Sequence, residues 1–202
     1  MIHMTRREKE KIDMRQAILK ASVEIILEEG YDKLSMRKIA SVIDYTPTTI
    51  YLYYKDKAQI IEDIAKEVYK QIVLYVQEVL AQNKNIPQNI QLEKTFKGFI
   101  YTMANNAEMS KAVIRSGTKA IFGTESNPNH TVPNGVAMLQ KILLEGQKKD
   151  IFRKLDDNVS WMIITALLGF SMNAIENYLY LETDWDKKVD IFVEFLIKGL
   201  LA

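Results

Sequence analysis

The sequence predicts an all-α protein of about nine helices, with a small three-helix domain at the N-terminus and a larger helical domain after it. Three observations support this prediction. Apolar residues recur three and four positions apart along most of the chain, which is the spacing of one helix face. No stretch alternates apolar and polar residues as a half-buried strand does. Capping residues, Gly and Pro stand at the breaks between the periodic stretches, where helices begin and end.

Composition places the chain among ordinary globular proteins, because 48% of its 202 residues are hydrophobic and 26% are charged. It has no Cys, which excludes a disulfide framework and a Cys metal site and fits the reducing cytoplasm. The first residues lack the apolar run of a signal peptide, and Met4 is a possible natural start. The longest uncharged run, Asn158–Ile175, is shorter than the roughly 20 apolar residues that span a bilayer, so we expect a buried helix and no membrane.

The first helix is predicted from Asp13, a possible N-cap, to Glu29, with Gly30 as its C-terminal stop. Its apolar face is made of Met14, Ile18, Ala21, Ser22 and Ile25. Residues 1–11 are polar, and we expect them to be frayed. Residues 5–20 carry six cations and three carboxylates, a local charge of +3 against +1 for the whole chain. Such an arm suits phosphate contact, but a solvated helix start explains it equally well.

A second, short helix is predicted after Ser35, whose hydroxyl can cap it. The spacing of its apolar residues gives it one buried face, made of Met36, Ile39, Ala40 and Ile43. Asp44 follows, and Asp tolerates the left-handed conformation better than most residues, so we expect a tight turn there.

A third helix is predicted to begin at Pro47 and to run through Tyr54, because Thr46 is an N-cap and Pro is favoured at the first helical position. Ile50 and Tyr54 are four residues apart and should face inward. The remaining side chains should lie nearer the outside: Thr48, Thr49, Tyr51, Leu52 and Tyr53. Two short helices joined by a turn form a helix-turn-helix, whose second helix enters the major groove of DNA. Packing within the core is the alternative role for the Tyr residues, and for Tyr54 it is the favoured one.

An ordered run of residues covers about the first quarter of the chain: Gly30-Tyr31, Ser35-Met36-Arg37-Lys38-Ile39-Ala40, Thr46, Thr49-Ile50-Tyr51, Tyr53-Tyr54 and Asp56-Lys57. This run resembles the N-terminal domain of the TetR family of bacterial transcriptional regulators. The resemblance implies phosphate contacts from Ser35, Thr46, Tyr53 and Lys57. It implies base contacts from Pro47, Thr48, Thr49 and Tyr51, and we add Arg37 to the expected DNA contacts.

The chain departs from the family pattern at two places. Asp44 stands where the family usually has Gly, so the turn should be shaped differently. Pro47 and Thr48 replace the commoner Lys/Gly-type pair, so no long cationic side chain stands at the start of the reading helix. We therefore expect specificity to come from Thr, Tyr and DNA shape rather than from Arg–guanine pairs.

A long helix is predicted from Lys57 to about Gln82, where one apolar face continues for about 26 residues, or roughly 39 Å. We place the domain boundary at its start, with residues 1–56 as the DNA-binding domain and residues 57–202 as the effector-binding and dimerisation domain. Further helices are expected over residues 92–106, 107–116, 136–149, 156–181 and 185–202. The segment 117–135 should be irregular, with one helical turn at 119–122.

The last two predicted helices, over residues 156–181 and 185–202, are too apolar for ordinary surface helices. Small residues such as Ala166 and Gly169 allow close approach of another helix. The pair could join its copy in a four-helix dimer interface, or it could be buried within one chain. The family resemblance implies the homodimer, which would read a palindrome with half-sites about 34–36 Å apart or a multiple of that.

The resemblance also implies a small-molecule effector in the larger domain. Aromatic and Met side chains suit an apolar or amphipathic ligand. The candidate wall residues are Phe96, Phe99, Met103, Phe122, Met138, Trp161, Met162, Asn173 and Tyr178. For any single one of them, an ordinary core position is the commoner role. No catalytic constellation, metal-ligand spacing or cofactor motif appears in the sequence, so we expect neither an enzyme nor a metal or cofactor.

These expectations describe a cytoplasmic, dimeric repressor that leaves its palindromic operator in double-stranded DNA when a small molecule binds. The alternative is an effector-independent DNA-binding activator or architectural protein. A third possibility is an all-α enzyme or scaffold in which residues 35–57 only pack. The sequence does not identify the operator, the regulated genes or the effector.

Overall fold

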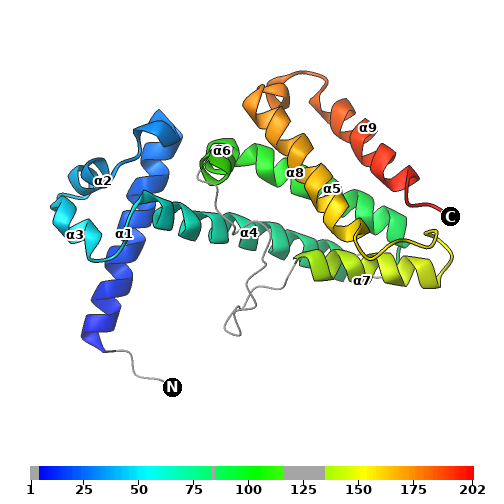
Figure 1. Ribbon diagram of the computed structural model, residues 1–202, viewed down its shortest axis with the longest axis horizontal. Helices are drawn as coiled ribbons and strands as arrows, with labels where there is room; N and C mark the ends of the chain where they lie inside the picture. The colour runs from blue at the N-terminus through cyan, green and yellow to red at the C-terminus, as the bar shows by residue number, and fades with distance from the viewer. Residues whose placement is uncertain (1–4, 83–84, 116–134) are drawn as a thin grey trace. The chain divides into compact units, whose positions relative to one another are not determined.

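The computed structural model describes residues 5–82, 85–115 and 135–202 (Figure 1). These residues form nine α-helices, two 3-10 helices and no strand, which confirms the all-α prediction. They fall into two compact units. Of the described residues, the first unit holds 5–67 and 108–115, and the second holds 68–82, 85–107 and 135–202. The functional boundary that the sequence suggests at residues 56/57 stays a prediction.

Helix α1 (Arg6–Glu29) begins well before the predicted start at Asp13. The Thr5 hydroxyl accepts a hydrogen bond from the backbone N–H of Glu8 at 3.3 Å, and the Glu8 carboxylate accepts one from the backbone N–H of Thr5 at 2.8 Å. This reciprocal pair is a capping box, which stabilises the first turn of a helix. The expectation of a frayed segment is therefore wrong for residues 6–11, and the Thr-x-x-Glu spacing is the signal that predicts the true start.

Three short elements follow α1 in the first unit: η1 (Tyr31–Lys33), α2 (Met36–Val42) and α3 (Pro47–Tyr51). We call these three elements and α1 the head. Their apolar side chains and those of α1 form one core with members Ile18, Ile25, Ile26, Leu34, Ile39, Ile50 and Tyr54. Helix α3 ends three residues before the predicted end. The last turn is of the 3-10 type, because the backbone N–H of Leu52 donates to the carbonyl of Thr49, three residues back, at 3.2 Å.

Helix α4 (Lys57–Gln82) has both of the bounds that the sequence predicts. Its first turns, to Glu67, belong to the first unit, where Ile60 and Ile61 are fully buried. The rest of α4 belongs to the second unit. Helix α6 (Ala107–Arg115) contributes the other segment of the first unit, from residue 108 onward.

The second unit is built around α5 (Gln88–Asn105), which packs on α7 (Gly135–Lys148), α8 (Val159–Glu176) and α9 (Trp185–Lys198). Its core includes Leu92, Phe96, Ile100, Leu139, Ile142, Ile163, Leu167, Val189 and Val193. Helix α5 begins at Gln88 rather than Leu92, because Pro87 fits the N-cap position and does not interrupt the helix. Gly98 lets α5 approach α4 closely, since a Cβ there would lie 1.7 Å from the ring of Tyr75.

Helix α8 ends at Glu176 instead of continuing to Leu181. Tyr178 adopts a left-handed conformation (φ 57°), which no helix can include, and the short η3 (Leu179–Leu181) leads from there to α9. Among the described helices, α8 alone is long and apolar enough to cross a bilayer, and a single such helix is weak evidence for a membrane. One side of α8 is buried, as expected for a core helix, and the other side is exposed in the single chain.

Candidate nucleic-acid interface

The turn between α2 and α3 has the geometry that the sequence predicts. The Ser35 hydroxyl accepts a hydrogen bond from the backbone N–H of Lys38 at 3.2 Å and caps α2. Asp44 is left-handed (φ 57°), so it makes the turn for which a Gly is the usual residue. The backbone N–H of Tyr45 then bonds to the carbonyl of Ala40 at 2.9 Å and closes the turn.

Helix α3 is fixed at its start by Thr46 and from the inside by two apolar anchors. The Thr46 hydroxyl accepts from the backbone N–H of Thr49 at 3.3 Å and lies 3.0 Å from the Thr49 hydroxyl. Pro47 stands at the first helical position. Ile50 is fully buried and Tyr54 is 1% exposed, as expected for the inward side. The face of α3 opposite Ile50 is therefore turned toward the solvent.

The nine expected DNA contacts differ in how they are exposed. The side chains of Ser35, Arg37, Thr46, Thr48 and Tyr51 are exposed, and those of Pro47, Thr49, Tyr53 and Lys57 are half-buried. The structure thus gathers most of them on and around α3 in one unit. Among the hydrogen bonds within the described residues, none involves the side chain of Thr48 or Tyr51, so these hydroxyls are the ones that α3 offers to a partner. Their role in DNA binding stays a prediction.

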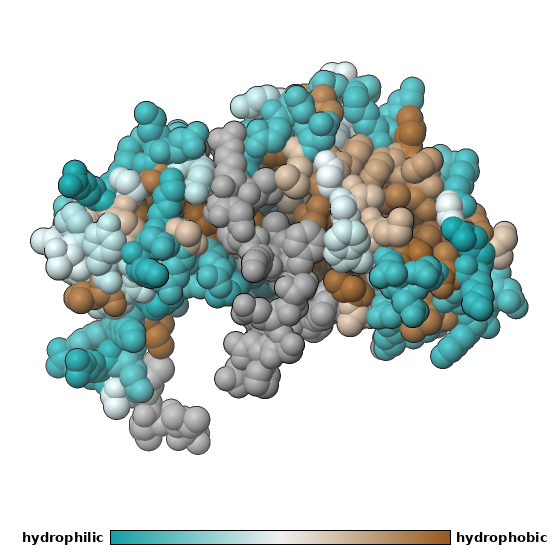
Figure 2. Space-filling view, viewed as in Figure 1, coloured by the Kyte–Doolittle hydropathy of each residue, from teal (hydrophilic) through white to brown (hydrophobic). Residues whose placement is uncertain are grey.

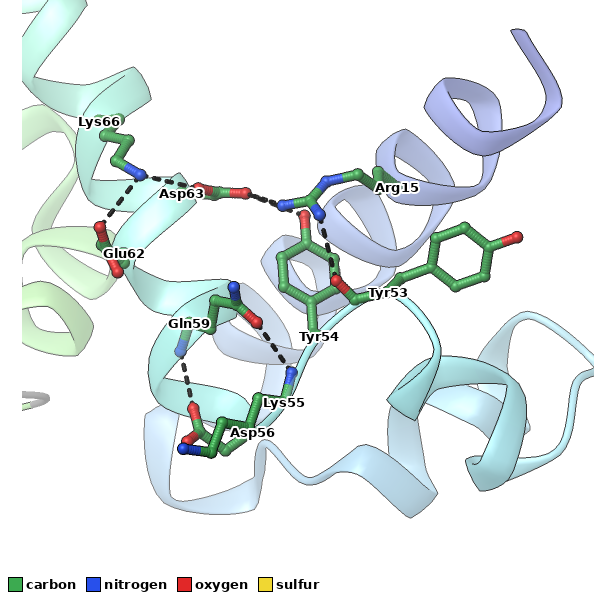
Figure 3. Close-up of polar contacts among 9 residues, drawn as sticks. All are labelled: Arg15, Tyr53, Tyr54, Lys55, Asp56, Gln59, Glu62, Asp63 and Lys66. Carbon is green, nitrogen blue, oxygen red and sulfur yellow. Dashed lines mark hydrogen bonds and ion pairs between the residues drawn. The ribbon is translucent and has the colours of Figure 1, made fainter. Parts of the chain in front are cut away.

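A polar cluster around Arg15 joins α1, the segment after α3 and the start of α4 (Figure 3). The Arg15 guanidinium donates to the carbonyl of Tyr53 at 3.1 Å and to the carboxylate of Asp63 at 2.7 Å. It also lies over the ring of Tyr54, 4.3 Å from its centre, and the Tyr54 hydroxyl donates to Asp63 at 3.2 Å. Lys66 donates to the second oxygen of Asp63 at 3.1 Å.

The protonation states of this cluster favour its hydrogen bonds at neutral pH. Burial first, and then the charge of Asp63, raises the pKa of Tyr54 to about 12, so its hydroxyl keeps the proton that it donates. Burial raises the pKa of Asp63, but hydrogen bonds and charges from Arg15 and Lys66 outweigh burial and hold it below the ordinary 3.8. Asp63 is therefore an anion with two cations beside it.

The ring of Tyr53 points away from the Arg15 cluster, although its backbone carbonyl belongs to it (Figure 3). This leaves the Tyr53 hydroxyl available for the phosphate contact that the sequence suggests. Asp56 begins α4 by accepting from the backbone N–H of Gln59 at 2.9 Å, while the Gln59 side chain accepts from the N–H of Lys55 at 2.8 Å. Because these two bonds begin α4, its start is fixed to the segment that follows α3 (residues 52–56), which we call the reading segment together with α3.

Lys57 at the first turn of α4 has a partner that the sequence does not indicate. Its ammonium lies 4.1 Å from the centre of the Tyr31 ring, a favourable cation–π position. This contact explains a cation at the unfavourable end of a helix dipole without DNA. A phosphate contact by Lys57 stays a prediction.

The candidate effector residues lie in different environments. Phe96 and Met103 are buried, and Phe99 and Met138 are half-buried. Phe122 and the helical turn expected at 119–122 lie outside the described residues. The remaining four are exposed on or just after α8: Trp161, Met162, Asn173 and Tyr178. The eight described positions therefore differ in burial, and an effector site among the nine stays a prediction.

The exposed side of α8 and the neighbouring side of α9 present large apolar side chains (Figure 2). We call Trp161, Met162, Ile191 and Phe195 the α8–α9 surface. Their exposed fractions lie between 55% and 72%. The rings of Phe170 on α8 and Phe192 on α9 stack with their centres 4.1 Å apart and hold the two helices together. Within the described part of the chain, no three His, Asp or Glu side chains come together as metal ligands.

Comparison with known proteins points to one family. Residues 18–64, which include α2, α3 and the start of α4, match the sequence profile described as bacterial regulatory proteins, tetR family. An uncharacterized HTH-type transcriptional regulator of Haemophilus influenzae is 28% identical over 96 residues, or 48% of this chain and 50% of that protein. The fatty acid metabolism regulator protein of Bacillus subtilis is 31% identical over 84 residues, or 42% of this chain and 43% of that protein. The matched region thus spans half or less of the length of these relatives.

The fold is similar over nearly the whole chain to that of solved regulators. The crystal structure of RolR in complex with its ligand resorcinol has a TM-score of 0.70 at 14% identity, covering 95% of this chain and 89% of RolR. At this identity the likeness concerns the fold.

The Arg15 cluster leads to a prediction about stability and its pH dependence. Asp63→Asn removes the charge that compensates the half-buried Arg15, and we expect it to lower the free energy of unfolding by about 1–3 kcal/mol at neutral pH. Because the folded pKa of Asp63 is lowered, its contribution is fully present above the unfolded value of 3.8 and is lost as the pH falls through the folded pKa. Denaturant unfolding should therefore show that the gap between wild type and variant narrows below pH 3.8.

Glu62→Gln is the matched control for this variant. Glu62 precedes Asp63 on α4, is about half exposed, and pairs with Lys66 at 3.1 Å without touching Arg15. We expect its effect to stay within about 0.5 kcal/mol. Equal losses from the two variants would contradict the assignment of Asp63 as the partner of Arg15.

Proposed function

The chain belongs, through its N-terminal domain, to the TetR family of bacterial transcriptional regulators, and we propose that it is a dimeric repressor that leaves a palindromic operator when a small molecule binds. Regulators of this family bind DNA and are generally cytoplasmic, and we propose that location here. The observation that carries the proposal is the outward face of α3, with exposed Thr48 and Tyr51 above buried Ile50 and Tyr54. An effector-independent activator or architectural protein remains the alternative.

We propose that α3 enters the major groove with Thr48, Thr49 and Tyr51 at the base edges. Thr hydroxyls and methyls can contact base edges and thymine methyls, and Tyr hydroxyls commonly contact phosphate. Pro47 and Thr48 give the start of α3 no cation, so discrimination depends on these neutral contacts and on DNA shape. Ser35, Arg37, Thr46, Tyr53 and Lys57 are proposed to hold the DNA backbone on either side.

We propose that the α8–α9 surface joins two copies of the chain. Large apolar side chains that lie together on a surface usually mark an interface. Gly169 and Thr165 lie on the same side of α8 as Trp161 and are exposed, so small side chains there allow a second helix to approach. In this arrangement Trp161 and Met162 contact the partner chain rather than an effector.

We propose that the effector binds within the second unit, beside Phe96, Phe99, Met103 and Met138. Among the described residues, three buried polar atoms have no hydrogen-bond partner: Gln88 Oε1, Thr95 Oγ1 and Ser171 Oγ. Buried polar atoms without a partner are unfavourable, and a bound ligand or water is the usual explanation. The neutral polar group of an amphipathic effector would supply a partner for one such atom. The ligand must bind the DNA-free state more tightly than the DNA-bound state, or it releases nothing.

DNA binding is tested by replacing Thr49 and Tyr51 with Ala together. The double variant is expected to lose specific operator binding, because both side chains lie on the reading helix and contacts to base edges are each worth about 1–3 kcal/mol. Fluorescence anisotropy with an operator duplex at physiological salt measures the loss. Leu27→Ala is the control, since Leu27 is 58% exposed on α1 and has no assigned role. Undiminished binding by the double variant would overturn the assignment of α3.

The dimer is tested by Phe195→Glu. Phe195 is 72% exposed, so a single chain tolerates the charge, whereas a charge buried without a partner in an interface is strongly unfavourable. Size-exclusion chromatography with light scattering should show dimers for wild type and monomers for the variant. Leu144→Glu places the same charge at an exposed apolar position of α7 and should leave the dimer intact. A dimeric Phe195→Glu variant would place the interface elsewhere.

The unpartnered buried hydroxyls are tested by stability measurements without ligand. Ser171→Ala removes a hydroxyl with no partner, so we expect the free energy of unfolding to stay the same or to rise. Ser22→Ala is the matched control, because Ser22 is equally buried but donates to the carbonyl of Ile18 at 2.7 Å, and its loss should cost about 0.5–1.5 kcal/mol. A larger cost for Ser171→Ala than for Ser22→Ala would show that Ser171 already has a partner in the ligand-free protein.

A further inference from the structure

The first two turns of α1 carry no packing against the rest of the first unit. All side chains of residues 6–13 are exposed, and Ile18 is the first fully buried residue of α1. A helix of this length is not stable by itself in water, so these turns depend on the capping box at Thr5 and on continuity with the packed part of α1. Residues 6–13 therefore form a rigid segment, about 12 Å long, that continues the axis of α1 beyond its packed part.

One side of this segment continues the core-facing side of α1. Lys11 and Arg7 precede Ile18 by seven and eleven residues, which are two and three helical turns. They also precede Arg15 by four and eight residues, so all three cations share one side of the helix. Arg15 donates to the carbonyl of Tyr53 at 3.1 Å, which shows that this side of α1 faces the end of the reading segment. Lys11 and Arg7 extend the cationic row along the axis of α1 by about 6 and 12 Å beyond Arg15.

The two outer cations of this row, Arg7 and Lys11, have no acidic partner among the residues that the structure describes. Arg6, on another side of α1, pairs with Glu10 at 2.8 Å. Glu8, three residues before Lys11 on the helix, accepts hydrogen bonds from the backbone N–H and the hydroxyl of Thr5, at 2.8 Å each. Arg7 and Lys11 take part in none of the ion pairs or hydrogen bonds among residues 5–82, 85–115 and 135–202. Hydrophilic side chains dominate this end of α1 (Figure 2).

From this geometry we propose that Arg7 and Lys11 bind DNA phosphates next to those contacted by α3 and Tyr53, so that the first turns of α1 are a second DNA-binding element. The inference rests on the proposed DNA-binding function. A row of unpaired cations on a rigid helix suits a row of phosphates, and such contacts supply affinity without sequence information. They would compensate for a reading helix whose first turn has no cation.

The test compares two double variants of the full-length protein that remove the same charge. Arg7→Gln with Lys11→Gln neutralises the proposed row. Lys9→Gln with Lys20→Gln neutralises two exposed cations on the opposite side of α1, half a turn from Ile18. Binding to a duplex obtained by selection from a random pool is measured by anisotropy from 50 to 300 mM salt. Light scattering and circular dichroism confirm that both variants are folded and have the oligomeric state of the wild type.

The Arg7/Lys11 variant is expected to bind roughly 10- to 100-fold more weakly, with a salt dependence reduced by about one unit of slope for each lost contact. The Lys9/Lys20 variant should bind as the wild type does. Equal weakening in both variants would mean a general charge effect and would overturn the proposal, as would unchanged binding by the Arg7/Lys11 variant. If the folded wild type binds no duplex, the proposed function itself has failed, whereas strong wild-type binding with no difference between the variants refutes only this inference.

Discussion

The hydrogen bonds of Arg15 are the interaction on which the head depends. Helix α3 has only five residues, too few to be stable or to hold a direction without support. Ile50 and Tyr54 bury its inner side, and Arg15 holds the carbonyl of Tyr53 directly after it. The same guanidinium bonds to Asp63 on α4, so one side chain joins the reading segment to the helix that continues into the second unit.

This arrangement gives a physical route by which α4 could influence DNA binding. A shift of the first turns of α4 would move Asp63, and with it the partner that orients Arg15 and the hydroxyl of Tyr54. The contacts at Asp56 and Gln59 fix the start of α4 to the same segment. The Arg15 cluster therefore attaches the segment after α3 to α4. Under the proposed function, a ligand that binds one position of α4 more tightly would change the fraction of chains that can bind DNA.

Local signals in the sequence predict the helices well, and long-range contacts explain what they miss. The caps at Ser35 and Thr46, the left-handed Asp44 and both ends of α4 follow from residue types at fixed spacings. The start of α1 is equally local, and the Thr5-x-x-Glu8 spacing predicts it. The Arg15–Asp63 pair joins residues 48 positions apart, and no periodicity relates them.

The larger unit shows the limit of pattern-based prediction more clearly. From the sequence alone, the apolar and aromatic residues of α8 are compatible both with a ligand pocket and with a dimer surface. Periodicity shows which residues share one side of a helix, but not what that side packs against. In the structure, Ile163 and Leu167 face the core while Trp161 and Met162 are exposed. The hydroxyl oxygens of Thr95 and Ser171 are buried without a hydrogen-bond partner in the described part of the chain, a feature that only packing can reveal. The sequence predicts an all-α regulator, whereas the assignment of side chains to pocket or interface needs coordinates.

The most direct test of this account is selection of DNA from a random duplex pool with the folded wild-type protein at physiological salt. The account predicts enrichment of a palindrome whose half-sites are about 34–36 Å apart or a multiple of that, as expected for two copies of α3 related by a two-fold axis. The recovered duplex would also allow small molecules to be screened for release. Absence of any enriched sequence, from protein shown to be folded and dimeric, would contradict the claim that the head held by Arg15 reads DNA.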